Sequence, residues 1–225
     1  INQLIFAAMK IPLILTVLFF LFTACNEEEL FQRENQNLSK NELKSATKTE
    51  KIYVYHVNKS SDTAEIKEIS PNSLYGHLKH GDYLATYVPD DNFEDALINL
   101  GYDFPPLDDF VPTKNICNVL SLDVSSFDIR DLTGVKDFVS VEQINLRQNQ
   151  LSELDLSKNK KLVFVDCSFN LLTSLDLSNN ELLVNLNCSQ NSLLDINVSN
   201  NPALEVLKCA VNQLISIDLS NNPSL

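Results

Sequence analysis

The chain is poor in several residue types that particular functions require. Tryptophan is absent, glycine occurs 4 times and methionine once among 225 residues. So little glycine argues against glycine-rich nucleotide-binding loops and against collagen-like or low-complexity sequence. Basic residues are also few, 17 against 30 acidic ones, and the formal net charge is −13. Because phosphate binding depends on clustered Lys and Arg, we expect no nucleic-acid partner.

What the chain does contain is enough apolar sequence for a folded core. Hydrophobic residues make up 44% of it, which argues against wholesale disorder. The simplest interpretation of the excess acidic charge is solubility.

The N-terminal segment has the features of a bacterial export signal. From Met9, the expected start, the chain reads MKIPLILTVLFFLFTACNEEE, with Lys10 ahead of the twelve-residue apolar run Ile11–Phe22. That run is shorter than the about 20 residues of a membrane span. It leads through small residues into Cys25 and so resembles a bacterial lipobox, with Phe22 where leucine is more common. The resemblance implies a signal peptide over residues 1–24 and a lipid on Cys25. An ordinary signal peptide with an incidental cysteine is the alternative.

Residues 25–50 have the composition of a tether. The acidic cluster Glu27–Glu29 resembles the surface-export signal of Bacteroidota lipoproteins, which implies a lipid-anchored protein on the bacterial outer membrane. The stretch onward to Glu50 is polar, contains neither glycine nor proline and shows no clear period. We expect it to hold the folded part away from the membrane.

The next two segments differ in their apolar period. Within residues 51–88, alternation predicts strands at 51–57, 64–69 and 84–88, a small β-rich region. Residues 89–118 are predicted to form a helical cap. There Asp91 and Glu94 are spaced as a capping box, and Gly101 is suited to the left-handed position after the helix. One apolar helical face carries Phe93, Leu97 and Leu100.

From position 119 to 225 the chain repeats one phrase. A copy has an apolar residue at its first, fourth and sixth positions and, in every copy after the first, asparagine at its ninth position. The first step between copies is 22 residues and each later step is 21. The copies start at Val119, Val141, Leu162, Leu183 and Leu204. A second phrase nested in the later copies ends in Asn159, Asn180, Asn201 and Asn222.

This pattern resembles the leucine-rich repeats of bacterial surface proteins, in their nested 21-residue form, over about residues 86–225. The segment NFEDALINLGYD is similar to the N-terminal cap of Bacteroidota members and, more loosely, of internalin-like proteins. The resemblance implies a leucine-rich-repeat solenoid, a β-rich right-handed coil of parallel stacked short strands, behind a short α-helical cap. The first turn departs from the pattern, with Phe127 in the asparagine column, and is expected to be transitional.

The recurring cysteines belong to a column that holds other apolar residues in the earlier turns. Its members are Val124, Leu146, Cys167, Cys188 and Cys209. A turn of a solenoid buries its apolar side chains only against its neighbours, so the members of a column stack. Valine and leucine in the same slot indicate a structural role for reduced cysteine. Three thiols in a file, about 4.8 Å apart from turn to turn, would not converge on a tetrahedral zinc ion. We therefore predict no metal and no cofactor here.

The recurring asparagines are predicted to be structural as well. An inward amide has donors and an acceptor for the backbone groups that a tight turn leaves unpaired. This column is Asn149, Asn170, Asn191 and Asn212. A serine column is expected to bond the next turn in a similar way, namely Ser157, Ser178, Ser199 and Ser220.

Outward positions of the sheet are where a ligand could be recognised, because the repeat does not specify them. Phe164 and Phe169 on either side of Asp166 form the most distinctive spot, since exposed aromatics beside polar groups suit contact with protein or glycan. The alternative is an ordinary surface whose partner binds elsewhere. The candidate ligand-binding residues are Gln143, Asn145, Arg147, Phe164, Asp166, Ser168, Phe169, Asn185, Asn187 and Lys208.

Other constellations give weaker signals. A row of Asp155, Asp176, Asn197 and Asp218 could in principle hold calcium, but a solvated face is the favoured interpretation. His77-x-x-His80 lacks the glutamate of a zincin. Ser45-x-x-Lys48 lacks the partner motifs of an acyl-enzyme site. We predict no enzyme.

The predicted function is therefore recognition. A lipid-anchored surface protein would use its repeat sheet to bind another protein or a surface glycan, with the membrane reached only through the N-terminal lipid. The alternative is a targeting or spacer module of a larger surface protein or enzyme.

Overall fold

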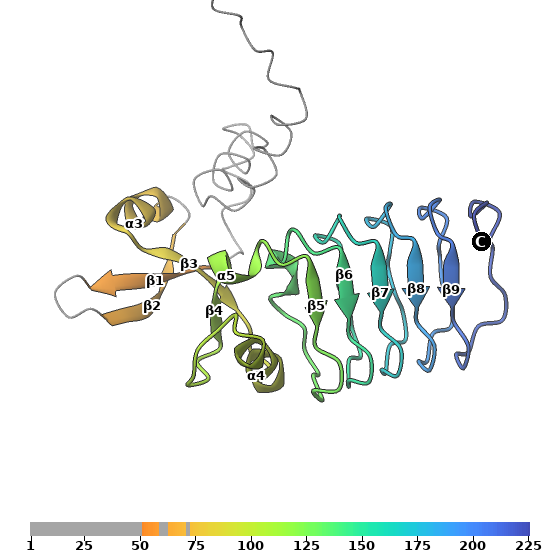
Figure 1. Ribbon diagram of the computed structural model, residues 1–225, viewed down its shortest axis with the longest axis horizontal. Helices are drawn as coiled ribbons and strands as arrows, with labels where there is room; N and C mark the ends of the chain where they lie inside the picture. The colour runs from red at the N-terminus through yellow and green to blue at the C-terminus, as the bar shows by residue number, and fades with distance from the viewer. Residues whose placement is uncertain (1–50, 59–62, 71–72) are drawn as a thin grey trace, which may run out of the picture.

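The computed structural model describes residues 51–58, 63–70 and 73–225, and two sheets of different construction lie along its length (Figure 1). An antiparallel sheet occupies one end, and a row of short parallel strands extends from it toward the C-terminal end of the chain. The predicted signal segment, Cys25, the tether and the Ser45–Lys48 spacing lie outside the described residues. Within those residues no helix is long and apolar enough to cross a membrane.

The antiparallel sheet has the strand order β2-β1-β3-β4. Its strands are β1 (Ile52–Asn58), β2 (Thr63–Ile69), β3 (Tyr83–Tyr87) and β4 (Phe110–Pro112). The three strands predicted from alternation are confirmed to within one residue. Strand β4 and the short helices α3 (Leu74–His80) and α5 (Thr113–Ile116) were not predicted from the sequence. Because β4 pairs with β3, residues from both sides of the predicted boundary at 88 share this sheet.

The predicted cap helix is present as α4 (Asp91–Asn99), but its N-terminal cap differs from the prediction. Asp90, one residue earlier, accepts hydrogen bonds from the backbone N–H groups of Asn92 and Phe93. Glu94 is fully buried and accepts from loop residues instead, so the capping-box prediction was wrong. Gly101 does take the left-handed conformation, with φ 79°. Leu100 is exposed, and the buried face of the helix is carried by Phe93 and Leu97.

The parallel sheet runs in the order β5-β6-β7-β8-β9. Its strands are β5 (Ser121–Asp123), β6 (Gln143–Asn145), β7 (Phe164–Asp166), β8 (Asn185–Asn187) and β9 (Val206–Lys208). Equivalent positions of successive copies are partners, as in Ile144 with Val165 and Val165 with Leu186. The predicted stacking of columns is confirmed, and the fold is a leucine-rich-repeat solenoid.

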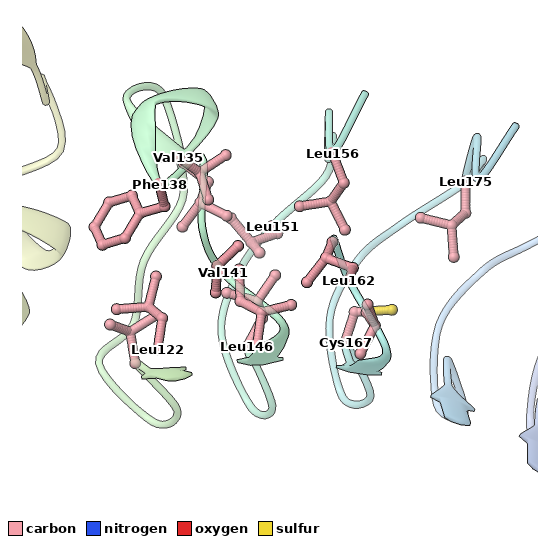
Figure 2. Close-up of a cluster of buried hydrophobic side chains, with 14 of the residues drawn as sticks. Leu122, Val135, Phe138, Val141, Leu146, Leu151, Leu156, Leu162, Cys167 and Leu175 are labelled. Carbon is pink, nitrogen blue, oxygen red and sulfur yellow. The ribbon is translucent and has the colours of Figure 1, made fainter. Parts of the chain in front are cut away.

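One continuous hydrophobic core runs from the cap helix through the solenoid. Figure 2 shows Leu122, Leu146, Leu162 and Cys167 on the strand side of the turns and Val135, Leu156 and Leu175 across the interior from them. Phe93 of α4 joins this core and lies 6.4 Å from Phe138, centroid to centroid. The cap helix therefore covers the open end of the solenoid. Removal from water makes each buried aliphatic or aromatic side chain contribute about 2 kcal/mol to the stability of this core.

The first turn of the solenoid lies against strand β3 through a glycine. Gly134 has φ 102°, and a Cβ there would lie 2.9 Å from the carbonyl oxygen of Tyr87. The short helix that follows, η2 (Val135–Asp137), brings Asp137 to Thr86, whose hydroxyl donates to Asp137 Oδ2 at 2.9 Å. A larger residue at 134 would therefore push the two sheets apart.

Candidate functional site

The exposed face of the parallel sheet presents two rows of side chains. In each strand the middle residue points inward, as Ile144, Val165 and Leu186 do with no exposed surface. The residues on either side of it face outward, because side chains alternate along a strand. Strand register aligns the first row as Gln143, Phe164, Asn185 and Val206, and the second as Asn145, Asp166, Asn187 and Lys208.

The second row is bonded within the sheet, which we did not expect of residues that the repeat leaves free. Asn145 Nδ2 donates to Asp123 Oδ2 at 3.0 Å, and Asn187 Nδ2 donates to Asp166 Oδ2 at 2.9 Å. Asp166 also accepts from the backbone N–H and the hydroxyl of Ser168. These amide and carboxylate groups therefore hold neighbouring turns together.

Arg147, Ser168 and Phe169 form one contact group at the edge of this sheet. The Arg147 guanidinium carbon lies 4.3 Å from the centre of the Phe169 ring, and Arg147 Nη1 donates to Ser168 Oγ at 3.3 Å. Phe169 is 42% exposed, whereas Ser168 is fully buried and so is not part of the exposed face. Phe164 is half-buried. A cation over an exposed aromatic ring contributes about 0.5–1 kcal/mol, which orients both side chains.

The edge row has a backbone conformation that sequence analysis did not predict. Gln148, Phe169, Gln190 and Val211 all have φ of 57–58°. Backbone bonds to the next turn hold the first three of them there, as from Phe169 N to the carbonyl oxygen of Ser189 at 3.0 Å. The left-handed region is unfavourable by roughly 1–2 kcal/mol for residues with a Cβ, and most so for bulky or branched ones. Glycine or asparagine would suit the backbone better than Phe169 and Val211.

The inner columns confirm the structural interpretation of asparagine. Asn170 Nδ2 donates to the carbonyl oxygens of Leu146 and Cys167 at 2.9 and 3.1 Å, and its Oδ1 accepts from Leu151 N at 3.0 Å. Asn149, Asn191 and Asn212 make equivalent bonds. Each of these amides therefore pairs groups of its own turn and of the turn before it.

The cysteine column is also a file of free thiols, as predicted. Cys167 and Cys188 are buried and Cys209 is half-buried, and none of the three is in a disulfide. Burial, together with the neighbouring thiol of Cys209, raises the pKa of Cys188 to about 12. A thiol with so high a pKa stays protonated and behaves as an apolar side chain.

The serine column does not act as predicted. Instead, the residue two positions before each serine accepts a hydrogen bond from the serine backbone N–H, as Asp155 Oδ1 does from Ser157 at 2.9 Å. Asp176, Asn197 and Asp218 repeat this arrangement. These bonds lower the pKa of Asp155, Asp176 and Asp218. The acidic row thus shapes a turn, which supports its interpretation as a solvated face.

Two groups of metal-ligating side chains lie in the N-terminal part, and sequence analysis identified neither. Glu94, Asp103 and Asp108 bring carboxylate oxygens within 4.8 Å of one another. Asp103 is 6% exposed and its Oδ2 has no hydrogen-bond partner. Burial, with the charges of Asp108 and Glu94, raises its pKa to about 6.

The second group combines His56 and His77 with Asp82. Both imidazole Nδ1 atoms lie within hydrogen-bond distance of Asp82 Oδ2, at 2.8 and 2.7 Å. Burial opposes ionisation of Asp82, but these contacts and the Val57 N–H lower its pKa to about 2. The structure thus assembles His77 with His56 and Asp82, a grouping that was not predicted from the sequence.

Comparison with known proteins gives structural neighbours alone, since no protein-family description and no curated protein matches the chain. The functional domain of InlJ from Listeria monocytogenes, which includes a cysteine ladder, is similar with 32% identity and a TM-score of 0.59, over 64% of this chain and 32% of that one. An internalin (inlF) from the same organism is 20% identical, with a TM-score of 0.48 over 62% and 48% of the two chains. The leucine-rich-repeat protein LIC12759 of Leptospira interrogans is 17% identical, with a TM-score of 0.39 over 51% and 38%. The chain spans about a third of the InlJ chain.

Proposed function

We propose that the chain is a surface recognition protein that binds another protein or a surface glycan through the exposed face of its parallel sheet. The contact group of Arg147 and Phe169 is the centre of the proposed site. The candidate residues around it are Gln143, Asn145, Phe164, Asp166, Asn185, Asn187 and Lys208. The same proposal has the chain lipid-anchored at Cys25 on the bacterial outer membrane.

The observation that carries this proposal is the presence of Phe169 and Val211 in left-handed backbone positions. These two side chains are 42% and 62% exposed, so burial in the core does not offset the backbone cost. Residues held in unfavourable conformations with exposed apolar side chains are typical of ligand-binding surfaces. The guanidinium over the Phe169 ring supplies a charged donor beside an apolar surface, which suits both glycan and protein partners.

The surrounding sheet supports such a site because it is rigid before binding. Asp166 and Asn187 are hydrogen-bonded to each other, and each also accepts from the turn that follows its strand. Side chains that are already ordered lose little entropy on association. A preorganised sheet can therefore recognise a partner with few contacts.

The test is a binding screen with defined probes. Immobilised chain would be incubated with a glycan array, with mucin and with purified extracellular-matrix proteins. For any probe that binds, we expect Phe169→Ala to lower affinity about tenfold, as hot-spot truncations do. Its free energy of unfolding should change by less than about 1 kcal/mol, because the lost contact is exposed.

The matched control is Leu194→Ala, which removes a 64% exposed apolar side chain outside the strands. Affinity should survive this change. If Leu194→Ala weakened binding as much as Phe169→Ala, or if neither did, the partner would bind elsewhere.

The lipid anchor is tested separately. Labelling of the expressed chain with palmitate should disappear in Cys25→Ala, and processing of the wild type should be sensitive to globomycin. A variant that kept its label would contradict the anchor and would leave the sheet proposal untouched.

A second candidate function is that of a targeting or spacer module within a larger surface protein or enzyme. The observation that favours it is that this chain matches 32% of the InlJ chain. Under this proposal the sheet would bind none of the probes, and binding or catalysis would belong to another part of the larger protein.

A further inference from the structure

We propose that His56, His77 and Asp82 form a binding site for a divalent transition-metal ion, with zinc the ion best suited to the ligands. Two imidazole nitrogens and one carboxylate oxygen are the donor types that zinc takes in proteins. This site lies on the antiparallel sheet and is independent of the proposed recognition surface.

The fold places each ligand on a regular element or at its end. In the pairing of β1 with β3, Tyr55 lies opposite Tyr83, so His56 and Asp82 are adjacent across the strands. Helix α3 ends at His80, and the φ of 98° at the following Gly81 lets Asp82 N donate back to the carbonyl oxygen of His77. This turn places the Asp82 carboxylate next to the His77 ring. A residue of β1 thus meets a residue of α3 at the carboxylate of the turn that follows this helix.

The distances are close to those of a coordination sphere. His56 Nδ1 and His77 Nδ1 lie 2.8 and 2.7 Å from Asp82 Oδ2, and the three ligand atoms are all within 4.8 Å of one another. Around tetrahedral zinc, with bonds of about 2.0 Å, ligand atoms are separated by roughly 3.3 Å. The imidazoles therefore need to withdraw by only about half an ångström to admit the ion.

The remaining groups suit metal binding as well. Val57 N donates to Asp82 Oδ1 at 3.0 Å, which orients the carboxylate and leaves Oδ2 directed at the imidazoles. Such outer bonds are typical of metal-binding side chains. The His56 and His77 side chains are 33% and 25% exposed, whereas Asp82 is 1% exposed. The ion can therefore enter from solvent on the histidine side, where water would complete its coordination.

Binding requires a change of tautomer in each ring. In the structure both Nδ1 atoms face a carboxylate oxygen and can donate to it. The ion takes the Nδ1 lone pair, so the ring proton must move to Nε2 through solvent, with no net change in ring charge. The ion then replaces two hydrogen bonds by coordination bonds that link β1, α3 and β3. We expect this to stabilise the antiparallel sheet.

The first experiment uses the wild-type chain, which contains three histidines. A two-bond ¹⁵N–¹H correlation spectrum of the imidazoles would be recorded during titration with zinc chloride. Zinc should shift the Nδ1 resonances of His56 and His77 and leave those of His80 in place. Shifts at His80 alone, or at no histidine up to millimolar zinc, would overturn the proposal.

The second experiment compares two substitutions on the same helix. His77→Ala should weaken zinc affinity by at least tenfold in equilibrium dialysis, whereas His80→Ala, three residues later and outside the group, should not change it. Zinc should raise the melting temperature of the wild type and of His80→Ala but not that of His77→Ala. Equal affinity in both variants would assign the zinc to other ligands, such as the half-buried Cys209 thiol.

Asp82→Asn provides a check that does not remove a histidine. The amide can still accept from Val57 N but supplies no anionic oxygen, so we expect weaker zinc binding with the imidazoles retained. If its affinity equalled that of the wild type, Asp82 would not be a ligand and the proposed site would be wrong.

Discussion

The parallel and antiparallel sheets of this protein solve the same problem, the pairing of buried polar groups, in different ways. In the solenoid the buried polar side chains stand in repeated columns, such as Asn159, Asn180 and Asn201. In the antiparallel part they are single residues that pair with distant loops, as Glu94 does with the backbone N–H groups of Asp108 and Asp109. The repeated asparagine columns leave the outward positions free to vary. In the antiparallel part, by contrast, each buried polar pair depends on its own residues.

The largest effect should follow removal of an inner strand residue from the middle of the solenoid. Leu186→Ala deletes a fully buried side chain of the continuous core, and we expect a loss of about 3 kcal/mol in the free energy of unfolding. Urea denaturation measures it. Leu182→Ala, at a 56% exposed position three residues before strand β8, serves as the control and should cost less than about 0.5 kcal/mol. Similar losses in the two variants would contradict the columnar core.

The two asparagine columns should differ in sensitivity. Asn170→Ala leaves the N–H of Leu151 and two carbonyl oxygens unpaired, and we expect a cost of about 3 kcal/mol. Asn180 Nδ2 donates to the carbonyl oxygens of Leu156 and Asn159, but its Oδ1 has no hydrogen-bond partner. Asn180→Ala should therefore cost about 1 kcal/mol less. Equal unfolding midpoints for the two variants would show that the columns are equivalent.

A smaller effect, with a pH dependence, is expected at Asp103. Its folded pKa of about 6 lies above the unfolded value near 3.9, so the native state binds more protons between these limits. Stability contributed by this group is thus present at low pH and decreases as pH rises from about 4 to 6. Asp103→Asn should stabilise the chain by about 1 kcal/mol at pH 7, after allowance for solvent screening, and flatten this part of the profile.

Glu94 and Asp108 face Asp103, and burial raises their pKa values in the same direction. The quantity to measure is therefore the difference between variant and wild type across pH 4–7. A variant that lost stability at pH 7 would show that the ionised carboxylate is needed, as it would be if a cation occupied the cluster.

The smallest effect should come from the cysteine column. Cys188→Val places in the slot the residue that Val124 already supplies in an earlier turn, and we expect a change of less than about 1 kcal/mol. Thermal unfolding under reducing conditions measures it. A loss of several kcal/mol would show that the thiols do more than fill space, for example through the contact of Cys188 Sγ with the carbonyl oxygen of Lys208 at 3.5 Å.

The repeat made much of the solenoid predictable. A side chain that returns at a constant interval must meet its own equivalents, so the columns of Asn170 and Cys188 could be assigned without coordinates. The predictions that failed concern choices among nearly equivalent neighbours. Asp90 rather than Asp91 caps α4, and Ser157 bonds to Asp155 of its own turn rather than to the next turn.

The sequence by itself determined the stacked parallel strands, the inward columns and the outward rows, because periodicity converts a short pattern into three-dimensional neighbours. Only the tertiary structure decided that His56 meets His77 and Asp82, and that Glu94 meets Asp103 and Asp108. These groups come from a strand, helices and loops that do not repeat. Their approach depends on strand register, on the turn at Gly81 and on the turn at Gly101, and of these only the turn at Gly101 was predicted from a local pattern. The left-handed position of Phe169 likewise arises from backbone bonds to the next turn, and these exist only once the turns are stacked.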